Sequence, residues 1–133
     1  MKALEGFSRI LITFIVAVMV IVKADIRRDC RKQSGVSWAA LKKLRAGDFN
    51  QEDHSVKCYL KCFMVKNGIM SEDNHVDVDK ALRHLPRKLQ EPSRKILARC
   101  KDSAGKDSCD KAFQIAKCYF KSQPGILKNV SFV

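Results

Sequence analysis

A chain of 133 residues with a mass of 15.1 kDa has room for one domain, which excludes a multidomain enzyme with a separate cofactor module. Its composition is 46% hydrophobic and 30% charged, so the chain can form a core and is not a disordered polyelectrolyte. Basic residues outnumber acidic ones and give a formal net charge of +12, and six cysteines are the strongest compositional signal.

The first 24 residues have the pattern of a secretory signal peptide. Lys2 and Arg9 give a basic start, and Ile10–Val22 is an uncharged apolar run of 13 residues. That run is shorter than the roughly 18 residues needed to span a bilayer, so the pattern favours cleavage after Ala24 over a retained anchor. We therefore expect a signal peptide at residues 1–24 and a secreted, extracellular domain at residues 25–133, with a net charge of +10.

The next two predicted elements are helices. Trp38, Leu41 and Leu44 share one helical face, and Gly47 ends that segment. In residues 55–67, apolar side chains recur every three or four positions with lysines between them, and a glycine follows. Both patterns predict helices, and the second helix should bury its apolar face and expose its lysines.

Three more helices are predicted in the second half of the chain. Residues 76–84 form one, which Pro86 terminates. Pro92 is expected at the first position of the next helix, where its missing N–H costs nothing. The last helix begins near Asp107, and Pro124 ends it ahead of an apolar tail. Because no stretch alternates with period two, the sequence predicts an all-α domain.

The cysteines predict a disulfide framework, because an exported small domain with an even number of cysteines is usually cross-linked. Their spacing lacks the paired C-x2-C motifs of zinc sites, so no metal site is expected. The six are Cys30, Cys58, Cys62, Cys100, Cys109 and Cys118.

Helical placement restricts how these cysteines pair. Cys58 and Cys62 are four residues apart, so their Cβ atoms lie about 5 to 6 Å apart on a helix, which is wider than the roughly 3.5 to 4.5 Å of a disulfide. Cys109 and Cys118 lie nine residues apart on one helix, about 13.5 Å along its axis. Excluding both pairs leaves ten of the fifteen pairings open.

The cysteine pattern resembles that of the insect odorant-binding proteins of the six-cysteine pheromone and general odorant-binding type. Three residues separate Cys58 from Cys62, eight separate Cys109 from Cys118, and long gaps lie before and between these pairs. With the signal peptide and the helical periodicity, the resemblance covers residues 25–133. It implies a compact six-helix domain, stapled by disulfides, that encloses an apolar cavity. The pairing it implies is Cys30 with Cys62, Cys58 with Cys109, and Cys100 with Cys118.

The function implied by the resemblance is that of a secreted carrier that reversibly binds a small hydrophobic ligand, such as an odorant, a pheromone or a lipid-like molecule. A membrane receptor is a candidate second partner for delivery. The candidate wall residues are apolar side chains of the predicted helices and of the tail, each of which could equally be ordinary core: Val56, Leu60, Met64, Leu82, Leu85, Ile96, Phe113, Ala116, Phe120, Val130, Phe132 and Val133. Met64 and Phe113 are favoured because flexible or large side chains adapt to ligand shape.

Catalysis is not expected from this sequence. A nucleophilic cysteine would have to escape the disulfide set, and His54, His75 and His84 fall in no recognisable spacing with a serine or a carboxylate pair. These histidines are interpreted as solvated residues, with pH sensing as the alternative. Neither a metal nor another cofactor is predicted.

The basic residues leave a second function open, that of a cationic secreted helical defence protein or lipid-surface-binding protein. The charges are spread along the chain and interleaved with acids, which is typical of a solvated surface. No aromatic stacking platform supports nucleic-acid binding, so an anionic membrane surface is the alternative partner. A carrier would bury its apolar side chains, whereas a membrane binder would expose an apolar stripe beside its cations.

Overall fold

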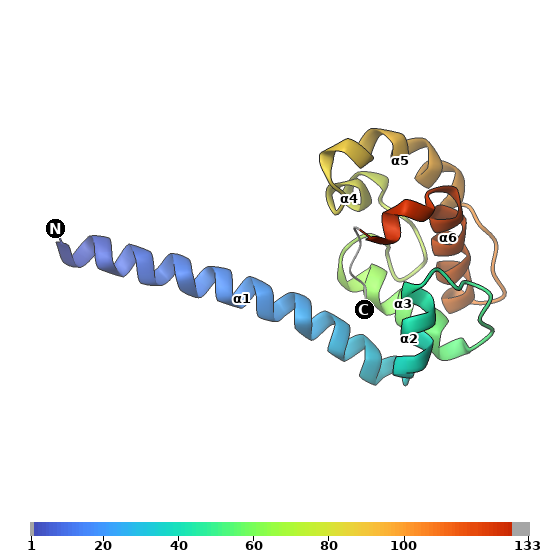
Figure 1. The fold of residues 1–133 in the computed structure, drawn as a ribbon, viewed down its shortest axis with the longest axis horizontal. Coiled ribbons are helices and arrows are strands. Elements are labelled where there is room, and N and C mark those ends of the chain that lie inside the picture. Colours follow the sequence, from blue (N-terminus) through green and yellow to red (C-terminus); the bar gives the residue numbers. More distant parts are fainter. Residues whose placement is uncertain (1, 129–133) are drawn as a thin grey trace.

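The computed structural model describes residues 2–128, with side chains described for residues 9–15 and 25–127. In these residues the fold consists of six α-helices and one short 3-10 helix, together with an isolated bridge between Met70 and Val76 (Figure 1). The elements are α1 (Lys2–Ser34), α2 (Trp38–Arg45), α3 (His54–Lys66), α4 (Val78–Arg83), α5 (Arg87–Cys100), α6 (Ser108–Ser122) and η1 (Pro124–Lys128). The prediction of an all-α six-helix domain is confirmed.

Polar side chains cap the starts of four helices. Ser37, Asp53, Asp77 and Asp107 each accept a hydrogen bond from a backbone N–H in the first turn of α2, α3, α4 and α6, respectively. The prediction of a helix from residue 76 was wrong at its start, because Asp77 is the capping residue and the residue before it belongs to the bridge. α4 is therefore a short helix that follows the bridge and its capping residue.

The prediction that Pro92 opens a helix was also wrong. α5 begins at Arg87, and Pro92 lies inside it. The first turn forms at Pro86, whose carbonyl accepts a hydrogen bond from the Leu89 N–H. Leu89 packs against the core, and Leu97 further along the helix is buried. This burial outweighs the one backbone hydrogen bond that an interior proline cannot make.

α3 and α6 pack against each other at the centre of the domain, and aromatic side chains fill the adjoining core. Phe49, in the loop before α3, stacks on Phe120 with ring centroids 5.4 Å apart and lies 5.8 Å from Phe113. All three rings are buried. The loop before α3 therefore supplies one ring of this aromatic core.

Three disulfides join the helices around this centre. Cys30–Cys62 links α1 to α3, Cys58–Cys109 links α3 to α6, and Cys100–Cys118 links α5 to α6. This is the pairing implied by the resemblance, and neither within-helix bridge is present. α2 and α4 contain no cysteine.

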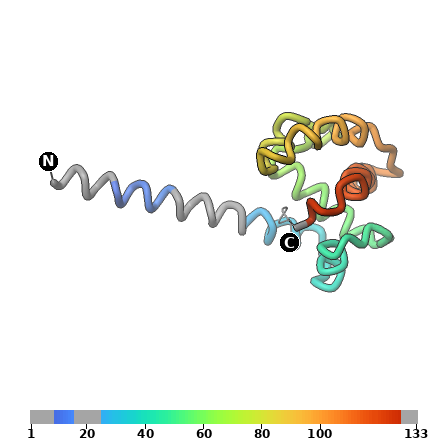
Figure 2. Tube along the Cα trace, turned by 45° about the horizontal axis from the view of Figure 1, so that its top comes forward, coloured from blue at the N-terminus to red at the C-terminus, as the bar shows by residue number. Residues whose placement is uncertain are grey.

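The N-terminal part of α1 stands apart from the other helices. Both views place residues 9–15 far from the rest of the fold (Figure 1, Figure 2). Their apolar side chains are exposed, with Ile10 at 72% and Phe14 at 66%. Among the described residues, no helix is long and apolar enough to cross a membrane.

The segment after α6 contributes to the core. Ile126, in η1, is buried, and Leu127 is partly buried against the same cluster. The predicted wall residues Val130, Phe132 and Val133 lie outside the described residues.

Candidate ligand-binding pocket

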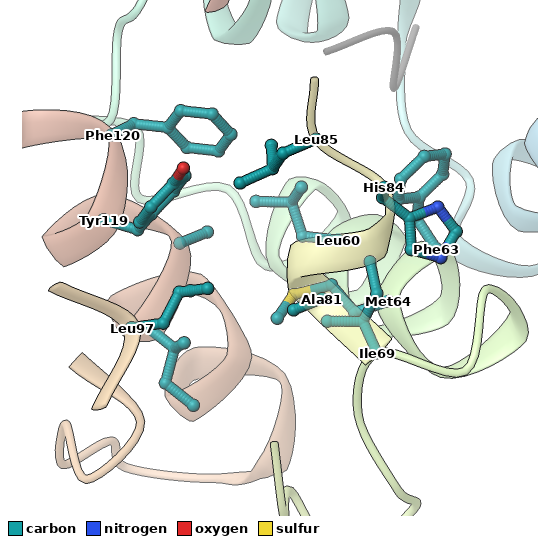
Figure 3. Close-up of a pocket in the computed structure, with 12 residues that line it drawn as sticks. Leu60, Phe63, Met64, Ile69, Ala81, His84, Leu85, Leu97, Tyr119 and Phe120 are labelled. Carbon is teal, nitrogen blue, oxygen red and sulfur yellow. The ribbon is translucent and has the colours of Figure 1, made fainter. Parts of the chain in front are cut away.

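A pocket of about 110 Å³ lies between α3, α4, α5 and α6 (Figure 3). Its wall residues come from these four helices and from the turns next to α3 and α4. They are Leu60, Phe63, Met64, Ile69, Ala81, His84, Leu85, Leu97, Ile115, Ala116, Tyr119 and Phe120. The pocket therefore forms where the two central helices meet the α4–α5 pair.

The wall is apolar apart from the side chains of His84 and Tyr119. His84 caps the C-terminal end of α4 and is exposed, with its Nε2 3.2 Å from the carbonyl oxygen of Asn67. Tyr119 on α6 is buried, and that burial raises the pKa of its hydroxyl above the ordinary value. The phenol is thus neutral at physiological pH and can both donate and accept a hydrogen bond.

The hydroxyl of Tyr119 belongs to a polar cluster at one edge of the pocket. Its oxygen lies 2.9 Å from Ser93 Oγ and 3.2 Å from Gln123 Oε1, and Ser93 donates to the same amide oxygen at 2.9 Å. Ser93 on α5 is fully buried, and Gln123 follows the last residue of α6. In Figure 3 the hydroxyl oxygen of Tyr119 lies on the side of Leu85 and Phe120.

The structure brings five of the predicted wall residues together around this pocket. These are Leu60, Met64, Leu85, Ala116 and Phe120.

Four other predicted wall residues lie elsewhere in the described core. Val56 and Leu82 are buried outside the pocket wall, and Phe113 packs on Phe49. Ile96 is partly buried beside the core. Their periodicity correctly placed these side chains on buried faces, but periodicity does not distinguish the part of a face that packs from the part that lines a cavity.

Seven residues of the pocket wall are not among the wall residues predicted from the sequence. Phe63 and Leu97 carried a usable signal, because both share a helical face with predicted wall residues. Ile69 follows a helix, Ala81 is small, and His84 had been interpreted as a surface residue. The remaining two are Ile115 and Tyr119. The proximity of these residues depends on how the helices cross, which a single sequence does not show.

A second polar cluster joins α3 to α6 away from the pocket wall. Lys57 Nζ lies 2.9 Å from Asp110 Oδ1, and Asp110 also accepts hydrogen bonds from the Lys106 backbone N–H and the Gln114 amide. These donors hold the pKa of the Asp110 carboxyl well below its usual range, and the Lys106 N–H has the largest effect. Because the charged groups of this cluster are paired with each other, we assign the cluster a structural role.

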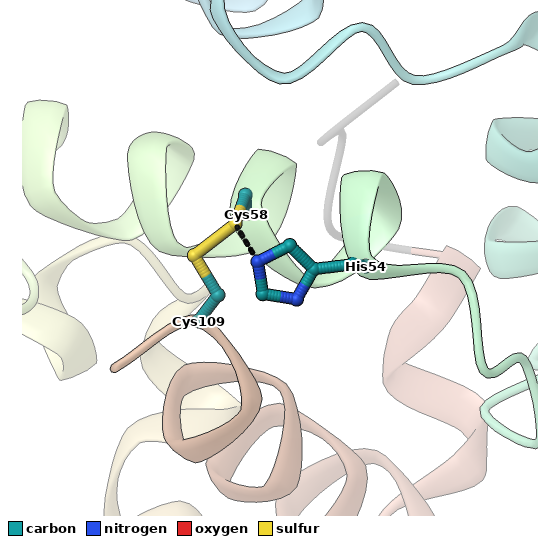
Figure 4. A group of neighbouring side chains, drawn as sticks. All are labelled: His54, Cys58 and Cys109. Atoms are coloured by element: carbon teal, nitrogen blue, oxygen red, sulfur yellow. Dashed lines mark hydrogen bonds between the residues drawn. A yellow bond between two sulfur atoms is a disulfide. The ribbon is translucent and has the colours of Figure 1, made fainter. Parts of the chain in front are cut away.

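His54, Cys58 and Cys109 form a third cluster, shown in Figure 4. The Nε2 atom of His54 lies 3.3 Å from Cys58 Sγ, and its Nδ1 lies 3.9 Å from Asp107 Oδ2. Both sulfurs belong to the Cys58–Cys109 disulfide, so neither is a thiolate that could bind a metal. The cluster therefore offers one exposed imidazole and one exposed carboxylate.

Comparison with known proteins places this chain in a family. Residues 22–122 match the PBP/GOBP family. The chain belongs to that family. It is 35% identical to Odorant-binding protein 10 of Aedes aegypti over 99 residues. This aligned segment covers 74% of this chain and 71% of the relative. The prediction of an odorant-binding protein is therefore confirmed.

Two solved structures of the same type share the fold. Odorant-binding protein 1 of Locusta migratoria superposes with a TM-score of 0.68 at 29% identity, covering 83% of this chain and 84% of the other. A protein described as the fatty acid binding protein OBP56a of the blowfly Phormia regina superposes with a TM-score of 0.65 at 31% identity, covering 82% and 94%. The PBP/GOBP family consists of odorant-binding carriers rather than enzymes.

Proposed function

We propose that this chain is a secreted carrier that reversibly binds a small hydrophobic molecule in the pocket between α3, α4, α5 and α6. The observation that carries the proposal is an apolar pocket in a core held by three disulfides. A close-packed domain would fill such a space, but cross-links worth about 2 to 4 kcal/mol each offset the cost of leaving it open. Family membership supports the same function.

The size of the pocket sets the scale of the ligand. At about 110 Å³ it is smaller than an engineered apolar cavity of about 150 Å³ that binds benzene in another protein. A single six-membered ring is therefore the natural probe for the pocket as it stands. A longer ligand requires wall side chains to move, and Met64 is the most adaptable of them.

Reversible entry is supported by how α4 is held. This helix contributes Ala81 to the wall and has no disulfide. α4 is held by the burial of Ala81 and Leu82, and by two exposed polar contacts, one between Arg94 and Asp79 at 2.9 Å and one between His84 and Asn67. Exposed contacts of this kind contribute only about 0 to 1 kcal/mol each, so the burial of Ala81 and Leu82 is the main barrier to a movement of α4 that admits a ligand.

The N-terminal pattern supports the proposal of secretion, and the exposure of that region is compatible with it. The exposed apolar side chains of residues 9–15 have no contact with the core cluster, so their removal would cost the domain no burial. We propose cleavage after Ala24 and release of residues 25–133. Delivery to a membrane receptor remains a proposal that rests on the resemblance alone.

The alternative of a membrane-active defence protein has less support. Among the described residues after Asp25, Trp38 is the single large hydrophobic side chain that is strongly exposed, and Arg31 lies over its ring at 4.2 Å. One tryptophan beside one arginine is not an apolar stripe. The surface described here therefore fits a carrier better than a membrane binder.

Filling the pocket tests the carrier proposal. In an NMR titration with toluene, we expect amide signals of α3 and α6 to shift. We expect Ala116→Leu to weaken toluene binding at least about tenfold, because the added side chain occupies the pocket. Ala39→Leu, on the exposed face of α2, is the matched control and should bind as the wild type does. Equal toluene affinity in Ala116→Leu and the wild type would place the ligand elsewhere.

A further inference from the structure

We propose that the polar edge of the pocket selects ligands that carry a hydroxyl group over matched ligands that can only accept a hydrogen bond. The residues responsible are Tyr119, Ser93 and Gln123. The inference rests on the proposed function and specifies the chemical class of its ligand. Tyr119 is the member of the cluster that lines the pocket.

The cluster holds three oxygen atoms at mutual hydrogen-bond distance but only two protons to place between them. Ser93 Oγ and Tyr119 Oη are 2.9 Å apart, and both lie within 3.2 Å of Gln123 Oε1. With both hydroxyl protons inside the cluster, two of the three contacts are hydrogen bonds. If Tyr119 turned its proton to the pocket, two contacts would bring lone pairs together without a proton. Tyr119 therefore keeps its proton inside.

The amide oxygen of Gln123 is what fixes this arrangement. An amide oxygen accepts two hydrogen bonds and donates none, so it draws the protons of Ser93 and Tyr119 toward itself. The backbone N–H of Gln123 donates to the carbonyl of Tyr119 at 3.1 Å, which anchors the residue one turn beyond the tyrosine. A ligand that reaches the Tyr119 hydroxyl from the pocket consequently meets oxygen lone pairs, which can only accept a hydrogen bond.

Burial makes this polarity matter for binding. Ser93 is fully buried and Tyr119 is 7% exposed, so little water is present to supply a missing partner. A ligand hydroxyl placed against Tyr119 Oη gains a hydrogen bond, whereas a carbonyl oxygen there meets lone pairs and is desolvated without compensation. The expected preference is for an alcohol over a ketone of the same size.

Three ligands of one ring size separate these effects. Cyclohexanol donates and accepts, cyclohexanone only accepts, and methylcyclohexane does neither. Affinities are measured by NMR titration of the full chain as secreted, and each variant is compared with the wild type ligand by ligand, which cancels differences in ligand hydration. We expect Tyr119→Phe to lower the affinity for cyclohexanol about threefold to tenfold, which is the range for one hydrogen bond. The affinities for cyclohexanone and methylcyclohexane should change less than about twofold.

Gln123→Met removes the shared acceptor and tests the proton count. Ser93 and Tyr119 then retain one hydrogen bond between them, and when Ser93 is its donor the Tyr119 proton is free to turn toward the pocket. We expect cyclohexanone to bind this variant about threefold more tightly than it binds the wild type, since it gains one hydrogen bond. Tyr59→Phe and Gln114→Met are the matched controls, because both residues lie outside the pocket wall.

Each result decides the inference. The inference would be supported if Tyr119→Phe bound cyclohexanol alone more weakly than the wild type does, and if Gln123→Met bound cyclohexanone more tightly. It would be overturned if Tyr119→Phe weakened cyclohexanone as much as cyclohexanol, since Tyr119 would then be a donor, or if no ligand responded to either variant. If Tyr119→Phe does not fold, Gln123→Met decides alone. Failure of all three ligands to bind the wild type would instead remove the proposed carrier site itself.

Discussion

Lys57 on α3 and Asp110 on α6 form an ion pair, with Nζ and Oδ1 2.9 Å apart, directly beside the disulfide between their chain neighbours Cys58 and Cys109. Both side chains are largely buried, at 12% and 9% exposed. The Lys106 backbone N–H and the Gln114 amide complete the coordination of the carboxylate. A covalent link and a saturated ion pair thus hold the two central helices in one register.

Replacing Asp110 by Asn should destabilise the fold by about 1 to 3 kcal/mol at neutral pH, because a charged acceptor with several donors is lost. Urea unfolding measures this effect. Asp79→Asn, in the exposed pair with Arg94, is the control and should cost less than about 1 kcal/mol. An equal cost for the two variants would contradict the structural assignment of Asp110.

The same variant makes a prediction about pH. The pKa of Asp110 in the folded state is held below its ordinary value, so its contribution to stability is complete above the unfolded pKa of about 3.9 and is lost as pH falls toward the folded pKa. The stability difference between the wild type and Asp110→Asn should therefore be constant from about pH 5 to pH 7 and shrink below about pH 4. A difference that grows on acidification would show that the carboxyl is not stabilised in its charged form.

The signal-peptide prediction is tested by the N-terminus of the secreted protein. Expression of the full chain in insect cells should release into the medium a protein that begins at Asp25, because Val22-Lys23-Ala24 precedes the expected cleavage site. Intact mass and N-terminal sequencing measure this. Retention of the chain in the cell membrane fraction with Met1 intact would contradict the prediction.

The tail residues Val130, Phe132 and Val133, which the sequence predicts as wall residues, are tested by a deletion that spares Ile126. Ile126 is part of the core, so a deletion that begins there removes packing as well as the tail. Deleting residues 129–133, which lie outside the described residues, should speed release of toluene while leaving helical circular dichroism unchanged. Unchanged release would assign the wall entirely to the described helices, and deletion from residue 126 is the comparison that should also lower the free energy of unfolding.

Trp38 provides the readout for the membrane alternative, because it is the single tryptophan of the chain and is 60% exposed. At an ionic strength of about 0.15 M, where the Debye length is about 8 Å, we expect no blue shift of its emission with anionic vesicles and no vesicle leakage. Neutral vesicles are the control. Leakage at low protein concentration would favour the defence function over the carrier.

Local signals in the sequence predicted most of the helical framework. Asp107 and Gly68 mark ends of helices through capping and positive φ, which depend on neighbouring residues alone. The start of α5 could not be predicted in this way, because burial of Leu89 and Leu97 carries the helix through Pro92. That burial depends on helices distant in sequence.

The candidate site was less predictable than the fold for the same reason. Leu60 and Ala116 were found because they lie on strongly apolar helical faces. Tyr119 and Ser93 carry no local mark of a binding site, and their hydrogen bond joins residues 26 positions apart on two helices. A polar cluster built across a helix crossing becomes visible only when the crossing is known.

The three disulfides overlap along the sequence in a way that governs proteolysis. The loop from Cys30 to Cys62 overlaps the one from Cys58 to Cys109, which overlaps the one from Cys100 to Cys118. A single peptide-bond cut anywhere between Cys30 and Cys118 therefore falls inside at least one closed loop, and the two pieces stay covalently joined. The cut expected after Ala24 lies outside that span. Cleavage at that site would release the N-terminal segment in one step, while a single later nick would leave the pieces of the carrier tied together until the bridges are reduced.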